Sequence, residues 1–287
     1  MTAVAAVLSV VIPAHDESAV IARLLGALAS ASGASQLEIV VVPNGCTDDT
    51  AERAAAFPGV RVSPIEVGSK IAALREADRV ATVFPRAYVD ADVDVSFDTL
   101  LALAEALSRP AGPLVASPRL VVDTTGASWP ARQFYKVWEL TEYRQKDHIG
   151  SGLYALSEQG RARFGDWPDV IADDRFIQQL FLPSERLSLP HHTFTVRSPR
   201  TLRAQIHRAT RINRGNRELP ATLQNAPAPE AGRHAELLKR VLRRPALWPA
   251  FPIYLAGSLI ASFRARRELA RGQAADWHRD DTTRATP

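Results

Sequence analysis

The sequence predicts an α/β protein with a mainly parallel central sheet flanked by helices and a helical appendage at its C-terminal end. Over residues 7–107, short β-branched apolar runs alternate with segments whose apolar residues recur at helical spacing. The composition, 46% hydrophobic and 23% charged over 287 residues, is that of a globular chain able to bury a full core. Alternation at this spacing is typical of a sheet with helices on both faces.

The first half of the chain is interpreted as strand and helix units in turn. Residues 7–12 form a β-branched run that Pro13 ends, and residues 18–30 have helical spacing. A second strand at 37–42 precedes an alanine-rich helix at 47–57, whose opening Thr47-Asp48-Asp49 suits an N-cap and first turn. A third strand, a third helix and a fourth strand are predicted at 60–65, 69–83 and 87–90.

The second half continues with a helix at 97–107, a strand at 114–122 and a helix at 129–143, whose aromatic residues are interpreted as core packing rather than an acceptor wall. Gly150-Ser151-Gly152 predicts a turn into a strand that ends at Leu156, after which Ser157 caps a helix. The remaining elements predicted are a helix from Asp173-Asp174 to Leu182, a strand at 187–196 and an arginine-rich helix after Arg200.

Three acids, Asp90, Asp92 and Asp94, follow the fourth strand at alternate positions. Clustered carboxylates repel one another, so they suit the C-terminal edge of a sheet, where a divalent cation would offset the repulsion. Taken alone, the pattern is explained better by a solvated strand end. Polar residues also follow the first strand, at Asp16-Glu17, and the second, at Asn44-Gly45. Because ligands of parallel sheets gather at this edge, the sequence predicts that the three sets converge.

Charge and cysteine content indicate the cellular compartment of the protein. The net charge of +4 is unevenly distributed, with −6 over residues 1–199 and +10 over residues 200–287. The single cysteine, Cys46, excludes an intramolecular disulfide and indicates a reducing compartment. The apolar start lacks a basic region and is interpreted as a strand rather than a signal peptide. We therefore expect a cytoplasmic protein.

Residues 245–263 are 19 residues without a charge, and basic clusters precede and follow them. That length nominally suffices for a bilayer, but Pro245, Pro249 and Pro252 disrupt the first half as a helix. Basic residues at both ends select no orientation. Three interpretations stay open, in falling order of preference: an interfacial or re-entrant membrane anchor, packing on the main domain or a homodimer contact, and a true span. An anionic membrane is preferred to nucleic acid as the partner of the basic region.

Six short segments occur in a fixed order along the chain. They are Val10–Glu17 at the first strand, Ile39–Thr50 at the second strand, Gly68-Ser69-Lys70, Asp90-Ala91-Asp92, Ala172-Asp173-Asp174 and Gln205-Ile206-His207-Arg208. In this order they resemble the motifs of family 2 glycosyltransferases, which have the GT-A fold: the opening strand, the second-strand motif, Gly-x-Lys, DXD, the acidic pair and Gln-x-x-Arg. The resemblance covers about residues 7–215, and each motif is weak alone. Ala209 departs from it, since family members have Trp after the Gln-x-x-Arg motif.

The resemblance implies transfer of a sugar from a nucleotide-diphosphate sugar to an acceptor hydroxyl, with inversion and with Mg²⁺ or Mn²⁺ as cofactor. It implies Asp92 as a metal ligand and Asp90 as a contact of the metal or the ribose. Asp174 is the expected base and Asp173 the residue that positions the acceptor, although these two roles are interchangeable and both acids could simply cap a helix. The residues expected to bind the donor are Pro13, His15, Asp16, Glu17, Asn44, Lys70, Asp90, Ala91, Gln205 and Arg208.

Several points are left open by the resemblance. Pro43-Asn44 stands where many relatives carry an acid that contacts uracil, so the donor is expected to be a UDP- or GDP-sugar without a choice between them. Asp94, His191 and His192 are expected to have supporting or structural roles. A sugar-1-phosphate nucleotidyltransferase is an alternative, although the chain lacks a Gly-rich basic loop after its first strand. A non-catalytic membrane-surface adaptor is a second alternative, which the intact acids disfavour.

The domain prediction follows from these motifs. Residues 1–217 are predicted to form the GT-A domain, 218–232 a linker rich in Pro and Ala, 233–271 a basic and apolar helical region, and 272–287 a disordered tail. The helical region makes peripheral contact with the cytoplasmic membrane face the expected location. A lipid-linked acceptor is then a plausible partner for the donor.

Overall fold

The computed structural model describes residues 5–31, 33–141, 148–170, 172–218 and 233–271. The chain divides into two compact units, each made of several segments. Unit 1 consists of Met1–Val121, Ile149–Asp169 and Phe181–Val196, and unit 2 of Val122–His148, Val170–Leu180 and Arg197–Pro287. Most of the predicted linker and all of the predicted disordered tail lie outside the described residues. The domain boundaries at 217, 232 and 271 therefore stay predictions.

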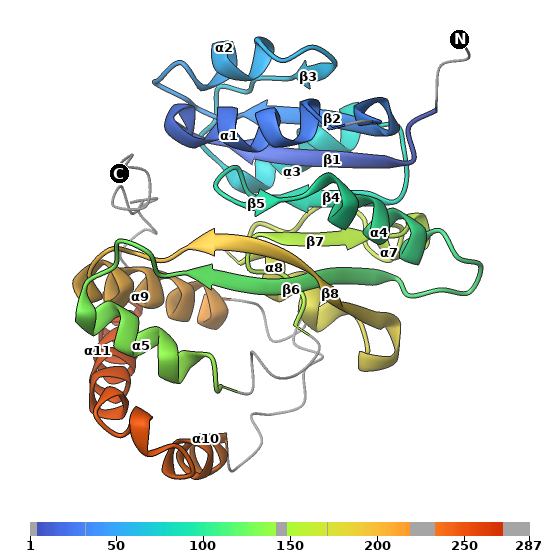
Figure 1. Ribbon diagram of the computed structural model, residues 1–287. Helices are drawn as coiled ribbons and strands as arrows, with labels where there is room; N and C mark the ends of the chain where they lie inside the picture. Colours follow the sequence, from blue (N-terminus) through green and yellow to red (C-terminus); the bar gives the residue numbers. More distant parts are fainter. Residues whose placement is uncertain (1–4, 32, 142–147, 171, 219–232, 272–287) are drawn as a thin grey trace. The chain divides into compact units, whose positions relative to one another are not determined.

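Unit 1 is built on parallel strands in the order β3-β2-β1-β4. Every residue of β1 is buried, as expected for a parallel strand covered on both faces. Helices α1 and α2 cover one face and α3 the other, the arrangement that right-handed crossovers produce (Figure 1). The bounds are β1 Leu8–Ala14, α1 Ser18–Ala29, β2 Leu37–Pro43, α2 Thr50–Ala55, β3 Val60–Val62, α3 Lys70–Val80 and β4 Arg86–Val89.

The sheet continues beyond β4 through β7, β6, β8 and β5. β7 is antiparallel to β4 and to β6, and β5 is antiparallel to β8. The arrows of β6 and β8 point the same way as that of β1 (Figure 1), so the predicted mainly parallel sheet is confirmed. The bounds are β5 Asp94–Val95, α4 Phe97–Leu107, β6 Val115–Asp123, β7 Leu153–Leu156, α7 Glu158–Arg161 and β8 Arg186–Arg197.

Side-chain caps decide where several helices of unit 1 begin. Ser69 accepts from the N–H of Ala72 ahead of α3, and Ser96 does the same for Thr99 ahead of α4. The prediction that Ser157 caps a helix is confirmed, since its side chain accepts from the N–H of Gly160. These caps are local in sequence, which is why the starts of such helices are readable from it.

The helix predicted at 47–57 is shorter than expected, because α2 begins at Thr50. The Asp16 carboxylate accepts from the N–H of Thr47 at 2.6 Å, and Asp48 accepts from the N–H of Thr50 at 3.1 Å. Asp48 also accepts from the N–H of Ser18 at 3.2 Å. Burial alone would raise the pKa of Asp48, but hydrogen bonds from the Thr50 hydroxyl, from Ser18 and from the Thr50 N–H hold it below its ordinary value. Residues 47–49 therefore form a turn that ties α2 to the start of α1.

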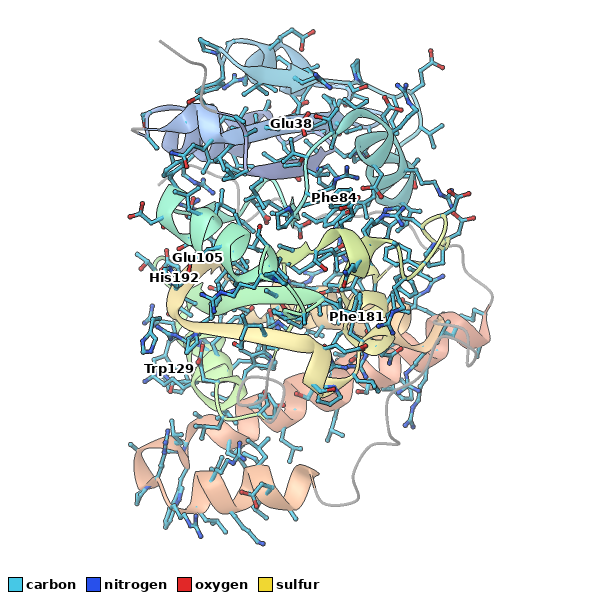
Figure 2. The ribbon with its side chains drawn as sticks, turned by 90° about the vertical axis from the view of Figure 1, so that its right-hand side faces the viewer. Glu38, Phe84, Glu105, Trp129, Phe181 and His192 are labelled. Carbon is cyan, nitrogen blue, oxygen red and sulfur yellow. The ribbon has the colours of Figure 1, made fainter. Side chains whose placement is uncertain are left out.

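Unit 2 contains α5 (Trp129–Trp138), α8 (Asp173–Leu180), α9 (Leu202–Glu218), α10 (Arg233–Leu242) and α11 (Ala250–Ala270). On α5, Phe134 and Tyr135 are buried, so their interpretation as core residues is confirmed, whereas Trp129 at the start of the helix is exposed (Figure 2). α8 ends before the predicted Leu182, because Pro183 disfavours helical geometry in the residue ahead of it. Within the residues described, no helix combines the length and apolarity that crossing a bilayer requires.

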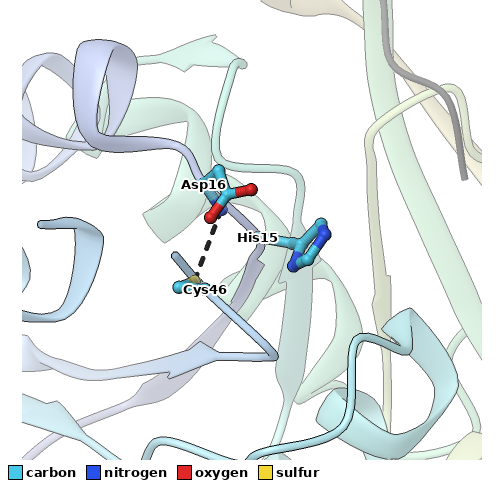
Figure 3. A group of neighbouring side chains, drawn as sticks. All are labelled: His15, Asp16 and Cys46. Carbon is cyan, nitrogen blue, oxygen red and sulfur yellow. Dashed lines mark hydrogen bonds between the residues drawn. The ribbon is translucent and has the colours of Figure 1, made fainter. Parts of the chain in front are cut away.

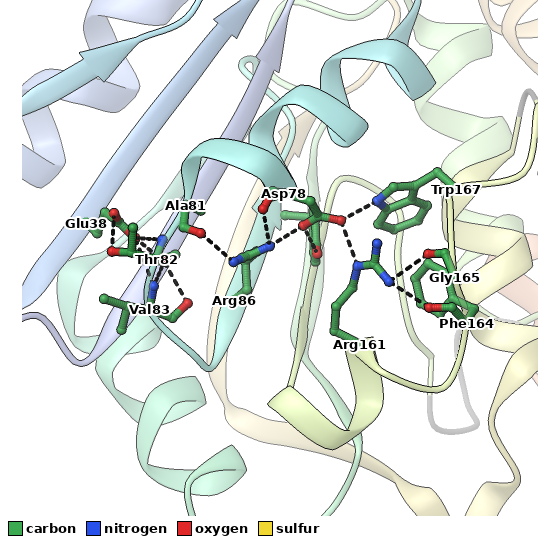
Figure 4. Close-up of polar contacts among 12 residues, drawn as sticks. Glu38, Asp78, Ala81, Thr82, Val83, Arg86, Arg161, Phe164, Gly165 and Trp167 are labelled. Atoms are coloured by element: carbon green, nitrogen blue, oxygen red, sulfur yellow. Dashed lines mark hydrogen bonds and ion pairs between the residues drawn. The ribbon is translucent and has the colours of Figure 1, made fainter.

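A largely buried carboxylate on α3 joins several elements of unit 1 (Figure 4). Asp78 accepts from the Tyr88 hydroxyl at 2.8 Å, from Arg161 Nε at 2.7 Å and from Trp167 Nε1 at 2.7 Å, and it is also paired with Arg86. Burial, together with the charge of Asp78, raises the pKa of the Tyr88 phenol well above its ordinary value. The phenol therefore stays protonated and keeps its role as a donor.

We expect Asp78→Ala to destabilise the fold by about 3–5 kcal/mol, because two largely buried guanidinium groups would lose their shared counter-charge. Urea unfolding followed by circular dichroism measures the effect. Glu105→Ala is the matched control: it also removes an acid from an arginine, Arg109, but that pair is exposed. An Asp78→Ala variant that unfolds at the wild-type midpoint would contradict the prediction.

Candidate active site

The C-terminal ends of β1, β2 and β4 lie side by side in unit 1, and the predicted polar residues follow them directly. β1 pairs with β2 on one side and with β4 on the other, in parallel. Asp16 thus follows β1, Asn44 follows β2 and Asp90 follows β4. The predicted gathering of these three sets at one edge of the sheet is what the topology produces.

Asn44 joins the ends of β1 and β2. Its backbone N–H and its side-chain Nδ2 both donate to the carbonyl oxygen of Ala14, each at 2.8 Å. The side chain is buried, and the ring of His15 contacts the Asn44 carbonyl oxygen through Nδ1. In this structure Asn44 fixes the geometry of the edge, while contact with a base stays a prediction.

His15, Asp16 and Cys46 place three potential ligand atoms within 4.8 Å of one another in the described part of the chain (Figure 3). The backbone engages this group already: the Cys46 thiol donates to the Ala14 carbonyl and accepts from the N–H of Asp16. Burial, with the neighbouring acids, raises the pKa of Cys46, so the thiolate that metal binding requires is disfavoured at neutral pH. A neutral thiol is also a poor ligand for Mg²⁺ and Mn²⁺, which favour oxygen ligands.

Lys70 and Asp90 form an ion pair at the same edge. Lys70 is the first residue of α3, and its Nζ lies 2.7 Å from Asp90 Oδ1. The loop ahead of α3 packs closely on the loop after β2, since a Cβ at Gly45 would lie 2.6 Å from the backbone N of Gly68. Gly45 also has φ of +56°, so glycine is needed there for both reasons. This close approach brings the loop that carries Lys70 against the edge.

The acidic loop after β4 is held from two directions. On one side, Arg23 of α1 donates to Asp94 Oδ1 at 2.5 Å and to the Asp92 carbonyl oxygen at 3.2 Å. On the other, the N–H of Asp90 donates to the Gly152 carbonyl oxygen at 2.8 Å. Asp94 therefore supports the loop, in line with the supporting role expected for it. Asp92, which is half-buried, lies between these two anchors in the chain.

The predicted site residues of unit 2 lie on α8 and α9. Asp173 is buried at the first position of α8, and Asp174 Oδ1 accepts from the N–H of Arg175 at 2.7 Å. Gln205 of α9 is buried and accepts from the Tyr135 hydroxyl at 2.6 Å, which joins α9 to α5. Arg208 is half-buried on the same helix.

Comparison with known proteins decides the family. Residues 9–163, more than half of the chain, match the family model described as glycosyl transferase family 2. The chain belongs to glycosyl transferase family 2. A search of curated protein sequences found no match.

Two solved structures illustrate the fold of this family 2 glycosyltransferase. The mannosyltransferase PcManGT from Pyrobaculum calidifontis, in complex with GDP-Man and Mn²⁺, is 22% identical with a TM-score of 0.59, over 96% of this chain and 82% of that one. S. aureus TarS 1-349 in complex with UDP is 14% identical with a TM-score of 0.50, over 96% of this chain and 94% of that one. Identities this low show the shared fold alone, which confirms the predicted GT-A class.

Two features of the candidate site were not found by sequence reasoning. Arg23 gave no signal, because it is an ordinary arginine on α1 and its partner Asp94 is 71 residues away. The sequence predicted Gly150-Ser151-Gly152 as a turn, but it did not predict that all three residues have positive φ. Glycine adopts positive φ readily, but for Ser151, with φ of +62°, this backbone is unfavourable and indicates a geometrically demanding position.

Gly152→Ala should disturb the acidic loop. A Cβ at this position would lie 2.9 Å from Val93 Cγ2 and 3.5 Å from Asp90 Oδ2, and φ is +108°. We expect a loss of stability of about 1–3 kcal/mol from the backbone strain, with a larger loss of transferase activity because Val93 and Asp90 must shift. Thermal melts and activity assays measure the two effects. Gly59→Ala is the control, with φ of +80° and no atom within 4 Å of its Cβ; equal activity losses in both variants would contradict the prediction.

Arg23→Ala should weaken the predicted Mg²⁺ or Mn²⁺ site without unfolding the protein. We expect the Kd for Mn²⁺ to rise about tenfold, since groups that orient metal ligands typically have effects of this order. Arg23→Lys should recover part of the affinity, because an ammonium group can pair with Asp94 but lacks the second arm that reaches the Asp92 carbonyl. Arg53→Ala, which removes an exposed pair with Asp49, is the control. Unchanged Mn²⁺ affinity in Arg23→Ala would exclude a positioning role.

Proposed function

We propose that this family 2 glycosyltransferase moves a sugar from a nucleotide-diphosphate sugar to an acceptor hydroxyl, with inversion at the anomeric carbon. The observation that carries the proposal is the Lys70–Asp90 ion pair at the sheet edge where Asp16, Asn44 and Asp92 also lie. A cation and several carboxylates gathered at the C-terminal edge of parallel strands suit a ligand with a diphosphate and a ribose.

The donor is proposed to lie along this edge. PcManGT is in complex with GDP-Man and TarS with UDP, and both share this fold, which supports a nucleotide-sugar donor without choosing the base. The residues proposed to contact the donor in unit 1 are Pro13, His15, Asp16, Glu17, Asn44, Lys70, Asp90 and Ala91. Among them Lys70 carries the positive charge that a diphosphate requires.

Asp92 and Asp90 are proposed to hold Mg²⁺ or Mn²⁺. Two carboxylates on one short loop suit a hard cation, and their mutual repulsion is already reduced by Lys70, which neutralises Asp90. PcManGT contains Mn²⁺ together with its donor, which supports a divalent ion here. When bound, such an ion stabilises the negative charge that develops on a leaving diphosphate.

The chemistry of transfer is proposed to depend on residues of unit 2. Asp174 takes the proton of the acceptor hydroxyl as that oxygen forms its bond to the anomeric carbon and the bond to the diphosphate breaks. Asp173 orients the acceptor, and because the two acids are adjacent the roles could be exchanged. Gln205 and Arg208 contribute further contacts to the diphosphate or the acceptor. Because Gln205 already binds Tyr135, it would do so from a fixed position.

We further propose that residues 1–217 form the catalytic domain and that residues 233–271 contact a membrane surface. A glycosyltransferase held at a membrane would meet acceptors that are lipid-linked. The acceptor hydroxyl is accordingly proposed to belong to a membrane lipid or a lipid-linked sugar.

The proposal predicts that one substitution abolishes donor binding and that another abolishes transfer alone. Asp92→Ala should abolish the stabilisation that a nucleotide-sugar with Mn²⁺ gives in a thermal-shift assay, because the ligand stabilises the fold only when it binds. Asp174→Asn should keep that stabilisation and lose transfer by several orders of magnitude, because the base is lost while the donor site is intact. UDP-glucose and GDP-mannose, each with and without Mn²⁺, form the first panel.

Asp98→Asn is the control for both variants, since Asp98 is an exposed acid in the first turn of α4. It should keep donor binding and turnover. Normal donor stabilisation in Asp92→Ala would remove the metal role of Asp92, and normal turnover in Asp174→Asn would remove its role as the base. Absence of any nucleotide-sugar effect in the wild type would overturn the donor class itself.

A further inference from the structure

Within unit 2, α11 uses one face to pack on α5 and α9. The buried positions of this face are Ala250, Gly257, Ala261 and Ala265. Their small side chains let the helices approach closely: a Cβ at Gly257 would lie 3.2 Å from the ring of Phe134 and 3.7 Å from Ile206 Cγ1. This face of α11 is therefore covered by α5 and α9.

The opposite face of α11 is apolar and exposed. Leu255, Leu259 and Phe263 follow one another at intervals of four residues, and they are offset by two from Gly257, Ala261 and Ala265, which places them on the other side of the helix. Leu259 is 61% exposed and Phe263 65% exposed. Single exposed apolar residues are ordinary, but several that form one stripe indicate a binding surface.

α10 repeats this arrangement. Its residues Leu237 and Val241 are buried in a cluster with Val137, Leu140 and Ala250, which attaches α10 and the start of α11 to α5. The neighbouring Leu238 and Leu242 are exposed, and Trp248, between the two helices, is also exposed. We call the large exposed apolar residues of α10, of α11 and of the segment between them the apolar face of unit 2: Leu238, Leu242, Trp248, Leu255, Leu259, Ile260 and Phe263.

Basic side chains border the exposed stripe of α11 at both ends of its sequence. Before Leu255 come Lys239, Arg243 and Arg244, after Phe263 come Arg264, Arg266 and Arg267, and all six are exposed. Residues 245–267 include no acidic residue. A surface that combines apolar side chains with basic ones matches the acyl boundary and the anionic headgroups of a membrane.

We propose that the apolar face of unit 2 docks onto an anionic membrane surface, with α11 lying along the membrane rather than crossing it. A second copy of the chain fits less well as the occupant. A two-fold dimer would bring the same patch against itself, and the basic border of one copy would meet that of the other. Docking of the apolar face does not depend on the proposed sugar transfer. Only the proposal that the acceptor is lipid-linked rests on the proposed function.

The test is flotation of the full-length protein with vesicles of phosphatidylcholine mixed with phosphatidylglycerol, compared with vesicles of phosphatidylcholine alone. The wild type should float with the anionic vesicles and far less with the neutral ones. Binding should weaken as salt rises, because the Debye length falls from about 10 Å at 0.1 M to about 3 Å at 1 M. Leu259→Asp/Phe263→Asp should reduce binding ~10-fold or more, since it places charge where apolar side chains would enter the membrane.

Leu182→Asp is the matched control, because it places the same charge at a 59% exposed leucine of unit 1. A second variant, Arg266→Glu/Arg267→Glu, keeps the apolar side chains and should lose the preference for anionic vesicles. Thermal melts and donor thermal shifts of each variant show that the fold and the donor site are intact, so loss of docking is separable from loss of catalysis.

Three results would overturn the proposal. The first is failure of the wild type to float with anionic vesicles at low salt. The second is equal flotation of Leu259→Asp/Phe263→Asp and the wild type. The third is a wild-type dimer in analytical ultracentrifugation that Leu259→Asp/Phe263→Asp converts to a monomer without any vesicle binding, which would identify a second copy as the occupant.

Discussion

The geometry of unit 1 depends on one largely buried carboxylate, Asp78, whose side chain is 11% exposed. A buried charge that loses its partners is strongly destabilising, so Arg86, Arg161, Tyr88 and Trp167 must all be in place together (Figure 4). Arg86 and Tyr88 are residues of β4, and the chain that leaves β4 is the acidic loop. Through this contact α3 fixes the strand that delivers Asp90, while the first residue of the same helix, Lys70, forms an ion pair with that acid. Helix α3 thus contacts β4 through Asp78 and neutralises Asp90, the residue that follows β4, through Lys70.

The acids near the sheet edge divide into two groups that differ in their contacts. Asp16, Asp48 and Asp94 each accept hydrogen bonds from a neighbouring loop or helix, and they hold the loops in position. Asp90 forms an ion pair with Lys70, and its N–H donates to the Gly152 carbonyl oxygen. Asp92 lies in the chain between Asp90 and Asp94, which Arg23 holds. An acidic cluster in a family 2 glycosyltransferase is therefore not uniformly a ligand set. Much of its charge is used to build the edge, because loops that approach each other closely need their N–H groups satisfied.

Unit 2 shows how one helix can be both structural and available for binding. The small residues of α11 allow close packing on α5 and α9, and Phe251 and Tyr254 add partly buried rings to this face. Leu255, Leu259 and Phe263 lie on the other face, where much of their apolar surface is exposed in the described chain. A helix that is apolar on both faces is ordinarily buried on both. The exposed stripe, with a basic border at each end, is what motivates a membrane as its partner.

The sequence by itself determined the elements of this protein and their order. Apolar periodicity, prolines and serine caps such as Ser69, Ser96 and Ser157 act within a few residues, so strands, helices and most helix starts could be predicted. The gathering of Asp16, Asn44 and Asp90 also followed, because parallel strands joined by right-handed crossovers end at one edge. Only the tertiary structure decided that Asn44 is buried against β1, that Arg23 holds Asp94, that β5 pairs with β8, and that Gln205 binds Tyr135. Each of these contacts joins residues far apart in the chain, and no local pattern encodes the distance at which packing finally brings two such side chains together.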